Sequence, residues 1–187
     1  RHYGGRLAFS PGGLLFVTNG DRYQRAPAQD LSTSIGKIVR LNPDGTPAAG
    51  NPFAATAGAL PEIWSLGHRN PYGLVFAQDG NLYESEHGPS GGDEFNRITA
   101  GANHGWPLVS EGDDGGPTPR HSTRPDFAAP LLSWTPAIAP GGLIQYRGTR
   151  FVGWDGDFIQ AGLAAQALVR VRLSGSGATE VQRIAMG

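Results

Sequence analysis

The sequence predicts an all-β fold of the β-propeller class, with about three blades. Three observations lead to this prediction: a repeat of about 67 residues, the lack of any long helical period, and turn residues spread along the chain. The 187 residues include 29 glycines and 15 prolines, which favour tight turns between short strands. Repeated small sheets at this spacing are typical of propeller blades. An open β-sandwich is the alternative that the same pattern allows.

The repeat is clearest in two hairpins, residues 5–16 and residues 72–83, which match with a constant offset of 67. Each copy contains an apolar strand, a glycine-containing turn and a second apolar strand. A looser third copy begins at residues 142–144 and returns through residues 157–159. The chain therefore predicts at least three hairpins of one kind.

A second type of strand also recurs, at residues 37–41 and residues 168–173. Its alternation of side chains predicts one inward and one outward face. The length corresponds to just under three repeats, whereas a closed propeller needs about four to eight blades. We therefore interpret residues 1–187 as a single partial propeller domain, cut at both ends, with no signal-peptide pattern at its start.

Composition excludes several classes of protein. Apolar residues make up 39% of the chain, which is enough for a core and argues against disorder. The formal net charge is -1 without a basic patch, which argues against a nucleic-acid partner. No apolar run approaches the roughly 18 residues of a membrane span. Cysteine is absent, which excludes disulfides and thiolate metal sites.

Polar segments follow both copies of the repeat, at residues 17–22 and residues 84–89. Equivalent loops of different blades open on the same face of a propeller. We therefore expect these segments to converge near the central axis, where loops held by rigid sheets form binding sites.

Two of the candidate segments carry side chains suited to proton transfer and anion binding. His2 precedes the first strand and can act as a general base, because the pKa of histidine lies near neutrality, or it can be structural. Arg69 offers a fork of donors for a carboxylate or a developing oxyanion, and Asn70 adds a donor and an acceptor. The alternative for this pair is a turn at the entry of a strand with a surface arginine.

Two further segments carry oxygen ligands. Residues 85–96 combine glycines, which expose backbone carbonyls, with the carboxylates of Asp93 and Glu94. This set suits Ca²⁺ rather than a transition metal, or forms a solvated acidic turn. In the segment from residue 101 to residue 114, Trp106 is either a flat wall for a ring or a core residue. Glu94 and Asp114 form either a second oxygen site or part of an acidic surface.

Taken in order, these segments resemble the soluble PQQ-dependent aldose sugar dehydrogenases of the glucose/sorbosone dehydrogenase family. The resemblance covers nearly the whole chain and rests on HYGGRLAFSP, GDR, AQDLSTSIGKIVRLNPDGTPAAGNPF, PEIWSLGHRNPYGL, SEHGPSGGDEFNRI and GANHGWPLVSEGD. It implies a six-bladed propeller that holds pyrroloquinoline quinone (PQQ) near its axis and oxidises aldoses at C1 to lactones. It also implies an external electron acceptor and a periplasmic location.

The resemblance implies a role for individual residues. His2 matches the general base, and Arg69 matches the residue that stabilises the quinone oxygen as hydride is transferred. Arg22 lies in the loop near the substrate. The residues that match cofactor contacts are Arg69, Asn70, His87 and Asp93. Of these, Asp93 supports the loop that begins at His87.

The resemblance further implies that Ca²⁺ polarises the quinone oxygens. The carbonyls of Gly88 and Pro89 match the ligands of this ion. Glu94, the carbonyl of His104 and Asp114 match a second calcium site. One departure concerns a lysine that contacts the PQQ carboxylates in some members, because this chain has Ala164 in that turn.

Two other functions remain open from the sequence. A calcium-dependent propeller hydrolase, such as a lactonase, would need carboxylate or amide ligands from several blades at one axial metal. A non-catalytic carbohydrate- or protein-binding propeller would not bring His2, Arg69 and His87 together. We expect the 187 residues alone to be weakly active or inactive.

Overall fold

The computed structural model describes residues 1–187 and consists almost entirely of β-strands. Two short 3₁₀ segments, η1 (Ala26–Gln29) and η2 (His121–Thr123), are its only helical turns. In chain order the strands are β1 (Gly4–Phe9), β2 (Leu15–Asn19), β3 (Lys37–Leu41), β4 (Ile63–Leu66), β5 (Pro71–Phe76), β6 (Leu82–Glu86), β7 (Asp93–Ile98), β8 (Leu132–Trp134), β9 (Pro140–Gln145), β10 (Phe158–Gly162), β11 (Ala167–Ser174) and β12 (Gly177–Ala185). The prediction of an all-β chain is confirmed.

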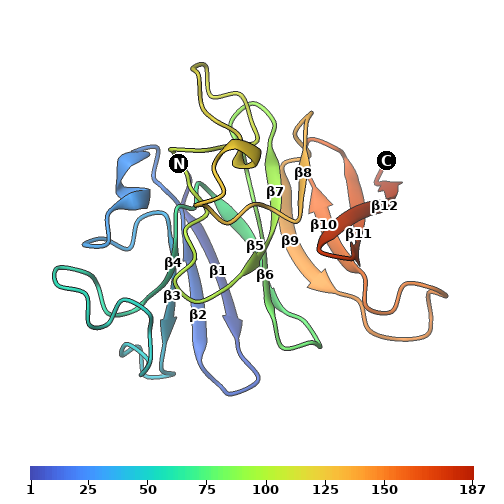
Figure 1. Cartoon of the computed structure of the whole chain (residues 1–187). Helices are drawn as coiled ribbons and strands as arrows, with labels where there is room; N and C mark the ends of the chain where they lie inside the picture. Colours follow the sequence, from blue (N-terminus) through green and yellow to red (C-terminus); the bar gives the residue numbers. More distant parts are fainter.

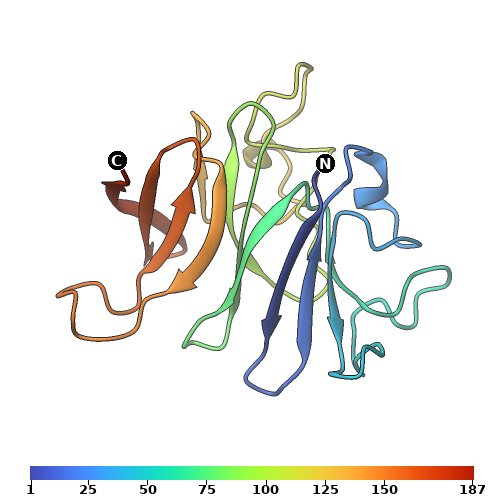
Figure 2. The ribbon, with the colours of Figure 1, turned by 180° about the vertical axis from the view of Figure 1, so that it is seen from behind.

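The strands form three four-stranded antiparallel sheets, and each sheet uses four consecutive strands. We call β1–β4 blade 1, β5–β8 blade 2 and β9–β12 blade 3. Figure 1 shows the three sheets side by side, in the order blade 1, blade 2 and blade 3. The first strands of the blades, β1, β5 and β9, are neighbours and lie together in front in Figure 2. This is the arrangement of propeller blades around an axis.

The repeat found in the sequence sets the positions of the strands. β1 and β5 begin 67 residues apart, and so do β2 and β6. The looser third copy forms β9 and β10, and the second type of recurring strand forms the third strand of blade 1 and of blade 3. The three predicted hairpins are therefore the inner halves of the three blades.

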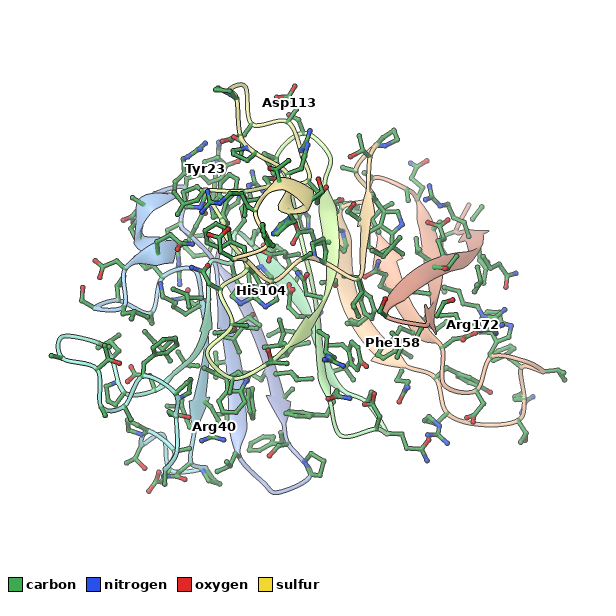
Figure 3. All side chains as sticks on the ribbon, viewed as in Figure 1. Tyr23, Arg40, His104, Asp113, Phe158 and Arg172 are labelled. Atoms are coloured by element: carbon green, nitrogen blue, oxygen red, sulfur yellow. The ribbon has the colours of Figure 1, made fainter.

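Apolar side chains fill the space between the blades. Between blades 2 and 3, the buried rings of Tyr83, Phe95 and Phe158 pack with centroids 4.7–5.6 Å apart. Figure 3 shows Phe158 on the side of blade 3 that faces blade 2. A smaller cluster, which includes Phe16 and Leu82, joins blades 1 and 2. Burial of each large side chain contributes roughly 1.5–3 kcal/mol, so these contacts hold the blades in register.

Polar contacts add to the junction of blades 1 and 2. The Arg6 Nε donates to the Tyr72 carbonyl at 2.8 Å, and the Thr18 hydroxyl donates to the Pro71 carbonyl at 3.1 Å. Both bonds fix β1 and β2 against the start of β5. None of the helical segments has the length and apolar character required to cross a membrane.

Candidate active site

The candidate site lies on the loops at one end of blades 1 and 2. β2 ends at Asn19 and β6 ends at Glu86, which are equivalent positions of the repeat. The loops that follow lie at the upper end of the sheets in Figure 1, close to the N-terminus and to the long segment between β7 and β8. The predicted convergence of these polar segments is what the structure shows.

His2 forms a dyad with Asp21. The His2 Nδ1 lies 2.6 Å from the Asp21 Oδ1, and the Asp21 side chain is 1% exposed. Because the carboxylate only accepts, Nδ1 carries the proton and Nε2 has its lone pair free. The His2 ring also stacks on the ring of Tyr23, with centroids 3.8 Å apart. The dyad therefore presents a fixed base nitrogen.

Asp21 is itself held in place by three other contacts. Its Oδ1 accepts from the Tyr23 backbone N–H at 2.8 Å, and its Oδ2 accepts from the Trp106 Nε1 at 2.7 Å. The Asp21 N–H donates to the Arg69 carbonyl at 2.8 Å. Trp106 is therefore a buried residue that positions Asp21.

The pKa of His2 is lowered from its ordinary value. Burial is the largest cause, and the nearby charges of Arg69 and His87 act in the same direction. The hydrogen bond and the negative charge of Asp21 oppose this shift. A lowered pKa keeps the imidazole neutral at neutral pH, which is the form a general base requires.

Arg69 and Asn70 are fixed by the carboxylate of Glu86. The Glu86 Oε2 accepts from the backbone N–H of Arg69 at 2.5 Å and from that of Asn70 at 3.1 Å. The Arg69 Nη1 donates to the His87 carbonyl at 3.0 Å. Burial lowers the pKa of Arg69, while the carboxylates of Asp21 and Glu86 oppose the shift.

Two buried polar atoms of this pair have no partner in the chain, namely the Arg69 Nε and the Asn70 Oδ1. Unpartnered buried polar atoms at one place indicate a missing polar ligand, because such atoms otherwise cost free energy. A planar cofactor with carbonyl and ring nitrogen atoms, such as PQQ, supplies both an acceptor and a donor. The donor set therefore fits that group.

His87 joins the site to blade 3. Its backbone N–H donates to the Asn70 carbonyl at 3.2 Å, and its Nε2 lies 2.8 Å from the Pro140 carbonyl. The His87 ring is tilted against Tyr72, with centroids 5.2 Å apart. Since a carbonyl only accepts, Nε2 carries the proton and Nδ1 is left as an acceptor.

Residues 87–92 form a tight loop rich in backbone carbonyls. No hydrogen bond of the chain ends on the carbonyl oxygen of Gly88 or Pro89. A Cβ at Gly88 would overlap the carbonyls of Gly91 and Gly92, so this position requires glycine. Free carbonyls on such a loop suit a hard cation such as Ca²⁺.

Asp93 braces this loop. Its Oδ1 accepts from the Gly88 N–H at 2.9 Å, and its Oδ2 accepts from the N–H groups of Ile138 and Ala139 at 2.8 and 2.7 Å. Asp93 is 1% exposed. The carboxylate thus ties the loop of blade 2 to the connection that leads into blade 3.

The residues of the predicted second calcium site are only partly brought together. Glu94 and His104 line one small cavity, but the His104 carbonyl accepts from the His121 Nε2 at 3.0 Å. Asp114 does not line that cavity and instead forms an ion pair with Arg25. The part of Asp114 in a calcium site stays a prediction that this geometry does not support.

Arg22 lies at the rim of the site. Its backbone N–H donates to the His2 carbonyl at 3.4 Å, and its Nη2 donates to the Asn19 Oδ1 at 2.6 Å. Its guanidinium lies over the Tyr3 ring, 4.5 Å from the centroid. Arg22 therefore lies next to His2, and its contact with substrate stays a prediction.

Sequence reasoning assigned no role to Asp21 or Glu86, although both lie in segments that it singled out. Asp21 falls two residues after the end of β2, and Glu86 is the last residue of β6. A carboxylate at the end of an inner hairpin was the available signal in both cases. The site residues that they hold, His2 for Asp21 and Asn70 for Glu86, lie 16 or more residues away, which no local pattern reveals.

Comparison with known proteins identifies the family of this chain. The family model described as glucose/sorbosone dehydrogenase matches residues 1–187. The aldose sugar dehydrogenase YliI of Escherichia coli is 36% identical over 98% of this chain and 51% of its own length. A solved structure named glucose dehydrogenase covers 100% of this chain and 54% of its own, with 38% identity and a TM-score of 0.93.

The PQQ-bound form of an aldose sugar dehydrogenase from Streptomyces coelicolor is also similar. It is 35% identical, with a TM-score of 0.77 over 97% of this chain and 48% of its own. The chain spans about half the length of the relatives it matches. From the strand order, the arrangement of the site and these likenesses, this propeller chain belongs to the glucose/sorbosone dehydrogenase family.

Proposed function

We propose that this chain carries the base and the quinone-facing side of the active site of a PQQ- and calcium-dependent aldose dehydrogenase. The observation that carries the proposal is the continuous set of contacts from His2 through Asp21 and Arg69 to His87. A binding propeller without catalysis has no need of a buried acid–histidine dyad next to an arginine with an unpartnered nitrogen.

The roles follow from the geometry. The His2 Nε2 takes the proton of the sugar C1 hydroxyl, and Asp21 stabilises the imidazolium that forms. PQQ, when bound, would supply the hydride acceptor for oxidation of the sugar C1 to the lactone. Arg69 and Asn70 would hold the quinone and supply donors toward an oxygen that gains negative charge. Gly88 and Pro89 would hold Ca²⁺ through their carbonyls, and His87 and Asp93 keep that loop in place.

The hydrolase alternative fits less well. Three of the four buried carboxylates of blade 2, Glu84, Glu86 and Glu94, face blade 1 in the interface between the blades and come from only two strands, while the fourth, Asp93, binds backbone N–H groups. These acids therefore do not form a metal site on the propeller axis with ligands from several blades.

We further propose that other blades complete the ring, and that the protein works in the bacterial periplasm. Leu7 and Phe9 are each 60% exposed on β1, on the side opposite Ala8, which packs toward blade 2. An apolar strand face of this kind fits contact with another blade. The 187 residues alone are expected to turn over little or no sugar.

The test uses the complete protein, supplied with PQQ and Ca²⁺, in an assay of aldose-dependent dye reduction. We expect activity, and a loss of at least about 100-fold in kcat for His2→Ala, since general bases contribute this much or more. Asp126→Asn, on an exposed loop, is the control for handling of the variants. Lactone hydrolysis without quinone, or full activity of His2→Ala, would overturn the proposal.

A further inference from the structure

The interface between blades 1 and 2 contains an acidic layer that the proposed function does not use. On β6, Leu82, Glu84 and Glu86 face blade 1, whereas Tyr83 faces blade 3. The cross-strand partner of Glu84 on β7 is Asn96, and that of Glu86 is Glu94. Two rows of polar side chains therefore lie directly above the apolar cluster that contains Leu82.

Two histidines lie in the same layer, namely His68 in the connection from β4 to β5 and His104 in the long connection from β7 to β8. The His68 Nδ1 lies 3.2 Å from the Glu86 Oε1, and the His68 Nε2 lies 2.9 Å from the Ser65 hydroxyl. The His104 ring stacks on that of His68, with centroids 4.7 Å apart. Both histidines are at least 98% buried. Figure 3 shows His104 in the middle of the molecule, beneath the loops.

The carboxylates of Glu84 and Glu94 in this layer have few hydrogen-bond donors and no cationic partner of their own. Asn96 Nδ2 donates to Glu84 at 3.0 Å and to Glu94 at 3.2 Å, and no Lys or Arg side chain pairs with either carboxylate. Buried charges in proteins are paired or coordinate a metal.

Several buried atoms in this layer have no partner at all. They are the Glu84 Oε1, the Asn96 Oδ1 and both ring nitrogens of His104. Glu84 and Asn96 are 0% exposed and His104 is 2% exposed, so bulk water does not satisfy these atoms. Such a concentration of unsatisfied donors and acceptors requires an ion or ordered water.

One ligand atom from each of His68, Glu84 and Glu86 lies within 4.8 Å of the other two. In a tetrahedral Zn²⁺ site with bonds of about 2.0–2.2 Å, ligand atoms are roughly 3.4 Å apart, so an inward movement of these side chains closes the set. Next to it, a cavity of about 10 Å³, lined by Glu86, Glu94 and His104, has room for about one water-sized particle.

We propose that His68, Glu84 and Glu86 bind one divalent transition-metal ion of the Zn²⁺ type between blades 1 and 2. An imidazole nitrogen with two carboxylates favours such an ion over Ca²⁺, which prefers oxygen ligands only. The second carboxylate oxygen of Glu86 holds the backbone of Arg69 and Asn70. The ion therefore supports the quinone-facing loop from behind.

The test measures metal content and needs neither quinone nor sugar, so its result is separate from that of the dehydrogenase assay. The complete protein is stripped with chelator, saturated with Ca²⁺ to fill oxygen-only sites, and titrated with Zn²⁺. We expect uptake of one equivalent of zinc, a rise in Tm of about 2 °C or more, and an X-ray absorption spectrum with nitrogen and oxygen neighbours.

Glu84→Gln removes one ligand charge at nearly constant shape and is expected to weaken zinc binding at least tenfold. The matched control is Glu62→Gln, on the half-buried glutamate just before β4, which is expected to bind zinc like the wild type. Absence of zinc uptake by the Ca²⁺-saturated wild type overturns the proposal, whether or not Glu84→Gln folds. Equal zinc affinity of Glu84→Gln and wild type overturns it as well.

Discussion

Asp93 offers the sharpest test of how the site is held together. Its buried carboxylate accepts three backbone hydrogen bonds, one from Gly88 and two from Ile138 and Ala139. In Asp93→Ala these donors lose their acceptor, and each buried orphan costs roughly 1–3 kcal/mol. We expect a loss of about 4 kcal/mol in the free energy of unfolding.

Asp93→Asn separates the effect of losing one hydrogen bond from the effect of losing the whole side chain. The amide keeps one acceptor oxygen and turns an N–H₂ toward the other donors. With its oxygen on the side of Ile138 and Ala139, it keeps two bonds and loses the one from Gly88. We therefore expect an intermediate loss of about 2 kcal/mol.

The assay is urea unfolding of the complete protein, with the midpoint compared at unchanged slope. Amide exchange at Gly88, Ile138 and Ala139 reports whether the loop opens locally before the protein unfolds. Asp126→Asn is the control, because that carboxylate is exposed and pairs only with Arg124. An Asp93→Ala midpoint as close to wild type as that of Asp126→Asn would refute the reasoning.

Three further predictions concern the base, the tight loop and the core. The rate of sugar oxidation by the complete protein should fall at acidic pH with a pKa below the ordinary value of histidine, because His2 must be neutral to act as the base. Asp21→Asn should move this acidic fall in the pH–rate profile to lower pH, because it removes the interactions that raise the pKa of His2. An unchanged acidic fall in that variant contradicts the assignment of His2 as the base. Gly92→Ala should lower the free energy of unfolding by about 3 kcal/mol, measured in urea, because the added methyl overlaps the backbone of Glu111 and Gly112. Gly115→Ala, whose methyl would lie in open space, should lower it by about 1 kcal/mol because of its positive φ alone. Equal losses in the two variants contradict the packing of the tight loop. In the same assay, Phe158→Ala should lower the free energy of unfolding by about 3–5 kcal/mol, and Phe158→Leu by less than half of that. Similar losses in both variants would show that the ring contacts do not stabilise this interface.

The strands could be predicted because their signals are local. Alternation of side chains and the offset of 67 residues placed both inner hairpins, and the structure has β2 and β6 at that offset. The turn at η1 was not predicted, because it depends on Lys37. That buried lysine donates to the carbonyls of Pro27, Ala28 and Ile35 at 2.7–3.0 Å. A lysine on a strand usually marks the exposed face, so sequence alone points the wrong way.

The site could be predicted only as a set of segments. His2, Arg69 and His87 lie in motifs that the resemblance identifies, and the structure connects them through Asp21 and through the hydrogen bond between Arg69 and His87. The residues that position them come from elsewhere in the chain, as with Trp106, which donates to Asp21 across 85 residues. Such contacts depend on the packing of one blade against the next, and no periodicity within a strand encodes them.

The two interfaces between blades differ in composition, one being aromatic and the other acidic. The interface of blades 2 and 3 is built around stacked aromatic rings, with Tyr83 and Phe95 on one face of blade 2. The other face of the same strands carries Glu84, Glu86 and Glu94, beside the loop of Arg69. A carboxylate there keeps the pKa of the buried Arg69 from falling further, so the arginine stays charged toward its ligand. Because burial of these acids costs free energy, the aromatic interface has to offset it. The site thus lies above the acidic interface, where Glu86 both fixes the Arg69 backbone and opposes the fall in the pKa of its side chain.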